Sequence, residues 1–285
     1  MSKVRILTDS TSDIPQEIRE ELGIVMVPLK VLFGEEVYAD AVTIGSDEFY
    51  EKLQASSQLP TTSQPSPIEF MEVYEQLLVE DANAPILSFH LSSAMSGTYQ
   101  SAVLGQSMLE GYHDITVVDS KSASYGFGFR VVAAAKLAKA GKSKEEILEN
   151  DARLASGLHL YFLVDTLEYL QKGGRIGKAS ALIGSILNIK PILSITNEGE
   201  VHAVDKVRGQ KKALGRIIEL LKQDFGPDEP VDIMIAWSQR NEMAMELCEQ
   251  VKSSFNVRDI TYTKLGAVIG THVGPGTSAV FMYKV

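Results

Sequence analysis

The amino-acid sequence predicts an α/β protein with two domains. The first is an N-terminal, parallel-sheet Rossmann-like domain over residues 1–164, and the second is a C-terminal α+β domain over residues 165–285. Three observations lead to this prediction. Short β-like runs alternate with longer helical patterns along the chain. The first three runs are each followed by a polar turn and a helix, as in a parallel sheet. In the second half, the turn TNEG at 196–199 joins two strand-like runs directly, which indicates an antiparallel pair.

Strands are expected wherever a short run is rich in β-branched and aromatic residues. The candidates are residues 4–8, 85–89, 115–118, 160–164, 192–195, 201–207, 231–237, 260–264 and 279–283. A further stretch, at about 25–45, alternates Val27, Leu29, Val31 and Phe33 before a Gly-Glu turn and more β-formers. This pattern predicts a small β-hairpin inserted into the N-terminal domain.

Two capping boxes predict where helices begin. Ser66 is followed by Pro67 and then Glu69, and Ser143 is followed by Glu146. In a capping box, the serine side chain accepts from the backbone N–H three residues later, and the acidic side chain there accepts from the backbone N–H of the serine. These two bonds satisfy N–H groups that have no partner inside the helix. Helices are therefore expected from 67 and from 144.

Composition bounds the function. The chain has 285 residues, of which 45% are hydrophobic and 22% charged, which is ample material for two packed domains. A formal net charge of −10 opposes nucleic acid and anionic membrane surfaces as partners. The apolar runs fall short of the roughly 18 to 20 residues that span a bilayer, and no export signal is visible. With Cys248 as its single cysteine, the protein is expected in the cytoplasm.

Three polar motifs carry the main functional signal: TSQP at 62–65, SGTYQ at 96–100 and GTHVGPG at 270–276. They supply hydroxyls, an imidazole and glycine turns, with almost no acidic or metal-ligand chemistry. Neutral donors of this kind hold a carboxylate or phosphoryl oxygen without reacting with it. The remaining histidines show no metal spacing. A binding protein with no metal and no cofactor is therefore predicted.

Supporting residues surround these motifs. Ser63 lies beside Thr62 near a helix start, and Gly97 and Thr98 follow Ser96 where a strand leads into a helix. The segment TDSTSD at 8–13 ends the first strand, so Asp9 and Ser10 are candidates for the site, although Ser, Thr and Asp favour helix starts for local reasons.

The motif KGGRIGK at 172–178 lacks the spacing of a nucleotide-binding loop. Its glycines make a flexible cationic turn, and Arg175 can bind an anion or a docking partner. Arg208 follows a predicted strand and is a similar candidate. His272 lies among glycines, which is typical of a loop that closes over a ligand.

Taken together, the motifs resemble the DegV family over essentially the whole chain. They are TDSTSD at 8–13, TSQP at 62–65, SGTYQ at 96–100, DSKS at 119–122 leading to GFG at 126–128, KGGRI at 172–176, KPI at 190–192 and HVGPG at 272–276. No single motif is decisive, but their common order along the chain makes the resemblance specific.

The resemblance implies a two-domain fatty-acid-binding protein that serves as the acyl carrier of a bacterial fatty acid kinase, in phospholipid metabolism. In that family a long-chain fatty acid lies in an apolar tunnel between the domains. Its carboxyl group is held by residues that match Thr62, Ser96 and His272, although Thr61 leaves an ambiguity of one residue. Arg175 and Arg208 match the cationic residues that meet the kinase or the phosphoryl group. The partner kinase binds ATP, so the chain alone is expected to be catalytically inert.

An enzyme is the main alternative. A phosphotransferase or hydrolase would use Ser96 and His272, with Asp9 or Asp119 as the orienting acid. Turnover of ATP or of a generic ester by the purified chain would favour it. A DNA-binding regulator is opposed by the acidic charge and by the absence of a basic recognition helix from the sequence pattern.

Overall fold

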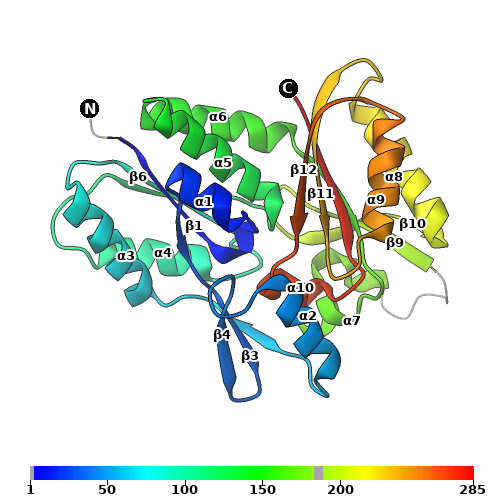
Figure 1. Ribbon diagram of the computed structural model, residues 1–285, viewed down its shortest axis with the longest axis horizontal. Helices are drawn as coiled ribbons and strands as arrows, with labels where there is room; N and C mark the ends of the chain where they lie inside the picture. Colours follow the sequence, from blue (N-terminus) through cyan, green and yellow to red (C-terminus); the bar gives the residue numbers. More distant parts are fainter. Residues whose placement is uncertain (1–2, 183–188) are drawn as a thin grey trace.

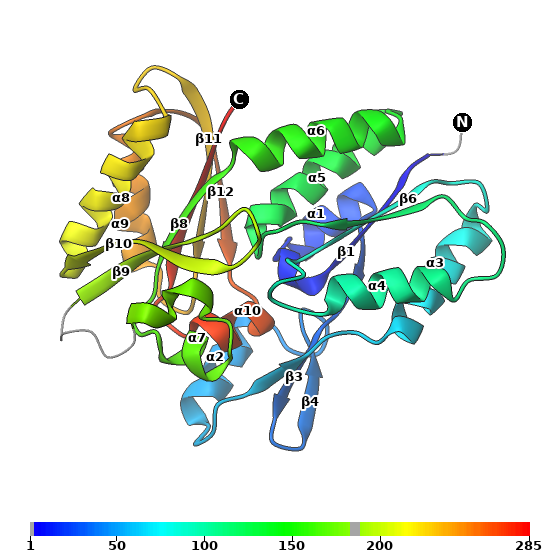
Figure 2. The ribbon, with the colours of Figure 1, turned by 180° about the vertical axis from the view of Figure 1, so that it is seen from behind.

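The computed structural model describes residues 3–182 and 189–285. It has a mixed α/β fold with a parallel sheet formed by the N-terminal half and a mixed sheet formed by the C-terminal half. The two halves lie side by side in both views (Figures 1 and 2). The largest group of buried apolar side chains joins them, because Phe89 and Phe127 of the first half pack in one cluster with Phe162 and Phe281 of the second sheet.

The first sheet has the strand order β2-β1-β6-β7, and every neighbouring pair is parallel. Its strands are β1 (Arg5–Asp9), β2 (Val25–Val27), β6 (Ile86–His90) and β7 (Ile115–Asp119). The chain leaves β1 on one side for β2 and returns on the other side for β6. The strand order therefore reverses between β1 and β6, and open α/β sheets bind ligands beyond the carboxyl ends of the strands at such a point.

Helices cover both faces of this sheet, as a parallel sheet requires. On one face lie α3 (Pro67–Glu80) and α4 (Thr98–Ser107), and on the other lie α1 (Gln16–Leu22) and α5 (Tyr125–Lys139). α6 (Lys144–Gly157) packs on α5, and the short 3₁₀ helix η1 (Ser10–Ser12) follows β1. Both predicted capping boxes are confirmed, because Ser66 and Ser143 each bond the N–H group three residues on.

The inserted hairpin is confirmed. It begins later in the sequence than predicted, and the insert contains a third strand and a helix in addition to the hairpin. β3 (Lys30–Phe33) and β4 (Glu36–Ala39) form the hairpin, and β5 (Thr61–Ser63) adds a third strand beside β3. α2 (Ser46–Ala55) lies between β4 and β5 in the sequence. Residues 25–27, which the prediction placed in the insert, form β2 of the parallel sheet. The alternating pattern runs through both segments, so the sequence does not show which sheet each one joins.

The second sheet has the order β10-β9-β8-β13-β11-β12, in which only β11 and β12 are parallel among the pairs described. Its strands are β8 (His159–Leu163), β9 (Ile189–Ile195), β10 (Val201–Arg208), β11 (Pro230–Trp237), β12 (Asn256–Lys264) and β13 (Ser278–Lys284). The predicted antiparallel pair across residues 196–199 is confirmed as β9 and β10.

β8 joins the second sheet, although it precedes the predicted domain boundary. A boundary after residue 164 assigns this strand to the N-terminal domain, but β8 pairs with β13 and β9 in the second sheet. Its main partner, β13, lies more than a hundred residues further along the chain, with Leu163 opposite Ser278. No local pattern reveals such a distant pairing, and the second sheet therefore begins at His159.

Helices cover the second sheet unequally. α8 (Gln210–Asp224) and α9 (Glu242–Lys252) pack on the face turned away from α5 (Figure 1). The other face meets the N-terminal half, near α7 (Glu168–Lys172), the 3₁₀ helix η2 (Gly177–Leu182) and α10 (Ala267–Val273). Across residues 3–182 and 189–285, no helix combines the length and apolar character needed to cross a bilayer.

Candidate functional site

A cavity of about 320 Å³ lies between the two halves of the molecule. The mixed sheet, β5, α10 and the loops beyond the carboxyl ends of the parallel strands contribute to its wall, which is mostly apolar. Among the lining residues are Leu91, Leu160, Phe162, Val201, Val268 and Phe281. This size and lining are typical of a small-molecule site, in which a few polar groups fix the orientation of an apolar ligand. We refer to it as the central cavity.

Five polar side chains of the lining gather in one part of this wall, and we call them the polar cluster. They come from β5 and the residue after it, from the loop after β6, from the turn after α7, and from α10: Thr62, Gln64, Ser96, Arg175 and His272. Ser63 also lines the cavity there. The predicted carboxyl-binding residues Thr62, Ser96 and His272 thus share one wall, although the sequence separates them by up to 210 positions.

Thr62 and His272 are in direct contact. The Thr62 hydroxyl lies 2.9 Å from Nε2 of His272. Burial, together with a smaller effect of the nearby Arg175 charge, lowers the pKa of His272 to about 4. The ring is therefore neutral at pH 7, and either Nε2 or Nδ1 carries its one proton. Nδ1 is buried without a hydrogen-bond partner in the described part of the chain.

Gly173 explains why a glycine turn stands next to this histidine. An added Cβ at Gly173 would stand 2.3 Å from Nδ1 of His272, which leaves no room for a side chain. Its backbone has an ordinary helical conformation, so the glycine is needed for close approach and not for a special φ. The sequence prediction assigned this motif to Arg175 alone and missed the steric role of its first glycine.

The loop of Ser96 packs against the end of β5. The Ser96 hydroxyl lies 2.9 Å from the hydroxyl of Thr98, and Thr98 N–H donates to Ser96 Oγ at 3.3 Å. Gly97 lies against the amide of Gln64, because an added Cβ would stand 2.4 Å from its Oε1. Gly97 and Thr98 therefore position Ser96 and do not line the cavity themselves. Gln64 also lines the cavity. It belongs to the motif TSQP, but the sequence pattern did not identify it as a candidate site residue.

Arg175 is exposed at the edge of the central cavity and is tied to the backbone on two sides. Its Nε donates to the carbonyl of Met95 at 2.9 Å, and its Nη1 donates to the carbonyl of Gly173 at 2.8 Å. The side chain thus connects the turn after α7 with the loop that carries Ser96. A guanidinium has five donors, so donors remain for an anion at the edge of the cavity.

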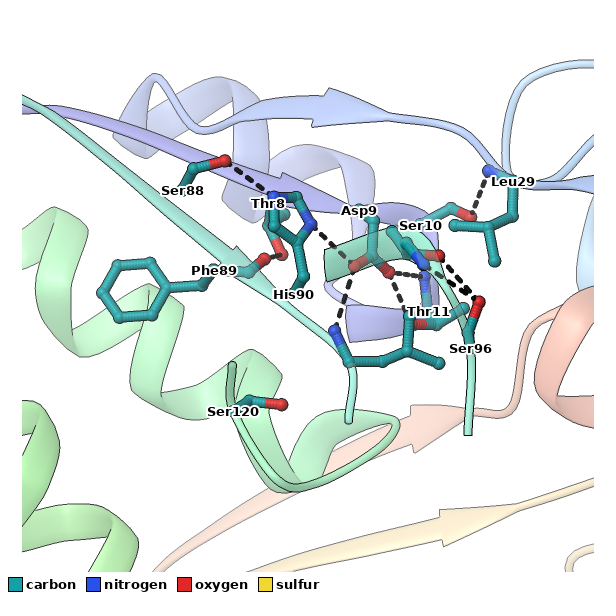
Figure 3. A network of polar contacts seen from close by, with 12 residues as sticks. Thr8, Asp9, Ser10, Thr11, Leu29, Ser88, Phe89, His90, Ser96 and Ser120 are labelled. Atoms are coloured by element: carbon teal, nitrogen blue, oxygen red, sulfur yellow. Dashed lines mark hydrogen bonds and ion pairs between the residues drawn. The ribbon is translucent and has the colours of Figure 1, made fainter. Parts of the chain in front are cut away.

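Asp9 and Ser10 are buried and belong to a polar network at the end of β1 (Figure 3). The Asp9 carboxylate accepts from Leu91 N–H at 3.1 Å, from Thr11 N–H at 3.0 Å and from Nδ1 of His90 at 3.0 Å. Ser10 Oγ accepts from the N–H of Leu29, a second residue that lines the cavity. Both side chains fix the backbone of residues that line the cavity and do not line it themselves.

Arg208 is not brought to the polar cluster. It ends β10 at an exposed position, beside the start of α8, whereas Val201 at the other end of the strand lines the cavity. At about 3.3 Å per residue, the two ends of β10 are roughly 20 Å apart. The sequence could not show this, because the position of a residue along a strand does not tell which end faces the ligand.

The arrangement that the enzyme alternative requires is not assembled. Within the described residues, no hydrogen bond joins Ser96 to His272. Asp9 bonds His90, and Asp119 accepts from Ser93. No group of three or more His, Cys, Asp or Glu side chains could hold a metal ion there either. The described residues therefore show no hydrogen-bonded relay from a carboxylate through His272 to Ser96.

The comparison with known proteins decides the family. A family profile described as "Uncharacterised protein, DegV family" matches residues 3–285. The chain belongs to the DegV family. A DegV domain-containing protein of Caldanaerobacter subterraneus is 40% identical over 285 residues, covering 99% of each chain. The family resemblance inferred from the seven motifs is thereby confirmed.

Solved structures of DegV-family proteins share the fold. A DegV family protein from Thermus thermophilus, described by its fatty acid binding, has a TM-score of 0.92 at 38% identity, covering 99% of this chain and 100% of its own. DegV of Bacillus subtilis, a fatty acid binding protein, has a TM-score of 0.89 at 36% identity, and both chains are covered completely. A family member from Ruminococcus gnavus was solved with vaccenic acid, with a TM-score of 0.83 at 28% identity, covering 98% of this chain and 99% of its own. DegV proteins with this fold thus bind fatty acids.

Proposed function

We propose that this DegV protein binds a long-chain fatty acid in the central cavity, with the carboxylate at Thr62, Ser96 and His272. The observation that carries the proposal is a mostly apolar cavity between the two halves of the molecule, with the polar cluster in one part of its wall. An amphiphile with one polar end matches this distribution. The fatty acids bound by related DegV structures support the same ligand class.

The two parts of the cavity contribute differently to binding. Burying about fourteen methylenes stabilises a complex by up to roughly 11 kcal/mol before ordering costs. One head-group hydrogen bond contributes roughly 0.5 to 3 kcal/mol. The apolar wall therefore supplies most of the affinity, and the polar cluster fixes where the carboxylate lies.

The neutral histidine orients the threonine. If Nε2 of His272 carries the ring proton, it donates to Thr62 Oγ1, and the hydroxyl hydrogen of Thr62 is free to donate to a carboxylate. A protonated ring would instead form an ion pair with the ligand. Because the pKa of His272 is lowered to about 4, the ligand meets a neutral donor at pH 7. A carboxyl oxygen held this way keeps more of its nucleophilic character than one in an ion pair.

We further propose that the protein presents this carboxyl oxygen to a separate ATP-dependent kinase and has no turnover or cofactor of its own. Arg175 supports this role, because it is exposed at the edge of the cavity and retains free donors for a phosphoryl group. Arg208 would have to meet the kinase at a second contact, roughly 20 Å along β10.

Mass spectrometry of a solvent extract tests the first proposal. Protein purified from a bacterial host should release an intact long-chain fatty acid in near-stoichiometric amount. A water-filled cavity or a bound nucleotide would contradict it.

The kinase proposal is tested with Arg175→Ala. This variant should keep its bound lipid and lose kinase-dependent formation of acyl phosphate, with Arg240→Ala as a matched control on an exposed arginine that does not line the cavity. Equal loss of lipid and of phosphorylation would instead place Arg175 in the lipid site. ATP turnover by the purified chain without a partner would contradict the carrier role.

A further inference from the structure

α10 carries His272 in its last turn, while its first turn is capped by side chains from distant parts of the chain. The N-cap residue, Gly266, has no side chain to offer. Its N–H donates to Oδ1 of Asp13 at 2.9 Å, and the N–H of Ala267 donates to Oδ1 of Asp40 at 3.0 Å. These N–H groups have no partner inside the helix. Two carboxyl groups therefore do for α10 what an N-cap side chain does elsewhere.

The two carboxyl groups converge on the same turn. An added Cβ at Gly266 would stand 2.7 Å from Oδ1 of Asp13 and 3.3 Å from Oδ1 of Asp40. Burial raises the pKa of Asp13 well above its usual range, and the charge of Asp40 raises it further. Burial also raises the pKa of Asp40 to about 6. Two carboxyl groups this close, away from water, titrate as a coupled pair.

Asp13 also connects α10 to the N-terminal half. Its Oδ2 accepts from the hydroxyl of Ser124 at 2.5 Å, and its backbone carbonyl accepts from Thr263 Oγ1 at 2.9 Å. Ser124 begins α5 and lines the central cavity. Asp13 has a φ of 51°, a conformation that costs free energy for a residue other than glycine. The fold thus retains a strained residue at the end of η1, where η1 contacts α5 and α10.

Asp40 comes from the inserted hairpin and is less completely bonded. Its Oδ2 is buried without a partner in residues 3–182 and 189–285, and so is the hydroxyl of Tyr50, which packs against Gly270 of α10. The titratable groups whose charge reaches the pair are Asp9 of β1, Tyr50 of α2 and Arg19 of α1. Figures 1 and 2 both show α10 directly beside α2.

We propose that Asp13 and Asp40 are positioning residues that hold α10, and with it His272, against the carboxylate-binding wall, and that the charge of the pair sets how firmly they hold it. The proposal rests on the proposed function for the importance of His272, although the hold itself is a property of the unliganded protein. Fewer than two helix turns separate the N-cap residue Gly266 from His272, so a shift at the first turn of α10 moves the His272 ring relative to Thr62.

Three variants test it: Asp40→Ala, Asp40→Asn and, as a control, Asp47→Asn. Asp47 is an exposed carboxylate on α2 that pairs with Lys264 near the same loop, but it caps no helix N–H of α10. The first measurement follows the ring ¹⁵N signals of His272 in unliganded protein between about pH 5.5 and about 7.5, a window above the titration of His272 itself. The second measures palmitate affinity across the same window.

Wild-type protein and Asp47→Asn should show His272 signals that shift with a midpoint near pH 6. Asp40→Asn keeps an acceptor for Ala267 but cannot ionise, so the step near pH 6 should disappear, and palmitate affinity should stay at its acidic-side value across the window. Asp40→Ala loses the acceptor, and its palmitate affinity should fall by about tenfold. If Asp40→Ala does not fold, Asp40→Asn still decides the question.

Signals of His272 that stay flat in wild-type protein, or that shift equally in Asp40→Asn, would overturn the proposal. A folded Asp40→Ala variant with wild-type signals and affinity would do the same. Failure of wild-type protein to bind palmitate would contradict the proposed function instead, and the His272 signals would still test the hold on α10.

Discussion

The two histidines at the carboxyl side of the parallel sheet have opposite environments. His90 is completely buried, and both ring nitrogens are bonded, Nδ1 to Asp9 and Nε2 to Ser88. His272 bonds Thr62 through Nε2 and leaves Nδ1 without a partner in the part of the chain described. The first histidine has no capacity left for a ligand, whereas the second lines the cavity.

The difference shows how one residue type serves two purposes. The Asp9–His90 group resembles part of a catalytic relay in composition, yet every donor in it is matched by an acceptor within the protein. Tyr74 donates to Ser88, which bonds His90, which bonds Asp9. A buried polar network that is fully satisfied gives the fold rigidity. The pair of Thr62 and His272 keeps hydrogen-bonding capacity that no described protein group uses, and this capacity supports the proposed carboxylate site.

The largest expected effect is on stability, from Asp9→Ala. The change leaves the N–H groups of Thr11 and Leu91 and the ring of His90 without their acceptor in a buried place. We expect a loss of roughly 3 to 5 kcal/mol in the free energy of unfolding, measured by chemical denaturation. His272→Ala should cost much less. Equal losses in the two variants would erase the distinction between the structural and the binding histidine.

A pH titration sharpens the same comparison. Because the folded-state pKa of His272 is about 4, lowered from its usual 6.5, the unfolded chain binds more protons between these values. The contribution of His272 to stability is therefore intact above about pH 6.5 and is lost as the pH falls toward about 4, by up to roughly 3 kcal/mol. The raised pKa values of Asp13 and Asp40 act in the opposite direction there.

The contribution of His272 is isolated by comparing wild-type protein with His272→Gln at each pH. As the solution is acidified, the free energy of unfolding of wild-type protein should fall relative to that of His272→Gln. A difference that does not change with pH would mean that the imidazole is not held neutral by its surroundings.

Gly173→Ala should disturb the binding histidine through sterics alone. The new methyl group would stand 2.3 Å from Nδ1 of His272, so the ring must move and its bond to Thr62 weakens. Overpacking of this kind costs roughly 1 to 3 kcal/mol. Gly215→Ala is the matched control, because nothing lies within 4 Å of its added Cβ and it stands in α8. A Gly173→Ala protein with an unmoved His272 ring in its crystal structure would refute the prediction.

The smallest effect on affinity is expected from Thr62→Ala. Loss of one head-group hydrogen bond should lower fatty acid affinity by about tenfold or less, because the apolar wall supplies most of the binding free energy. Kinase-dependent phosphorylation should fall much more, since the carboxyl oxygen is no longer fixed for attack. Titration calorimetry with a defined fatty acid measures the first quantity. Thr61→Ala is the control, and a larger effect there would show that the neighbouring hydroxyl points inward.

Much of the fold followed from local patterns. The capping boxes at Ser66 and Ser143, the three parallel strands and the β9–β10 pair were predictable because each depends on residues close together in the sequence. The seven motifs likewise identified the DegV family, and they named Thr62, Ser96 and His272. These residues share one wall of the cavity, as the proposed carboxyl site requires, although their role as ligands of a carboxylate stays a prediction.

The rest depended on contacts between distant segments. The sheet to which β8 belongs is set by pairing with β13, and the distance of Arg208 from the polar cluster is set by the direction of β10. Asp13 and Asp40 look like ordinary turn residues until the fold brings both to Gly266. Sequence determines which groups a chain carries and how short segments fold, because those interactions are local. The packing of the two halves decides which groups are satisfied and which stay available to a ligand, because burial and long-range pairing exist only in the folded molecule.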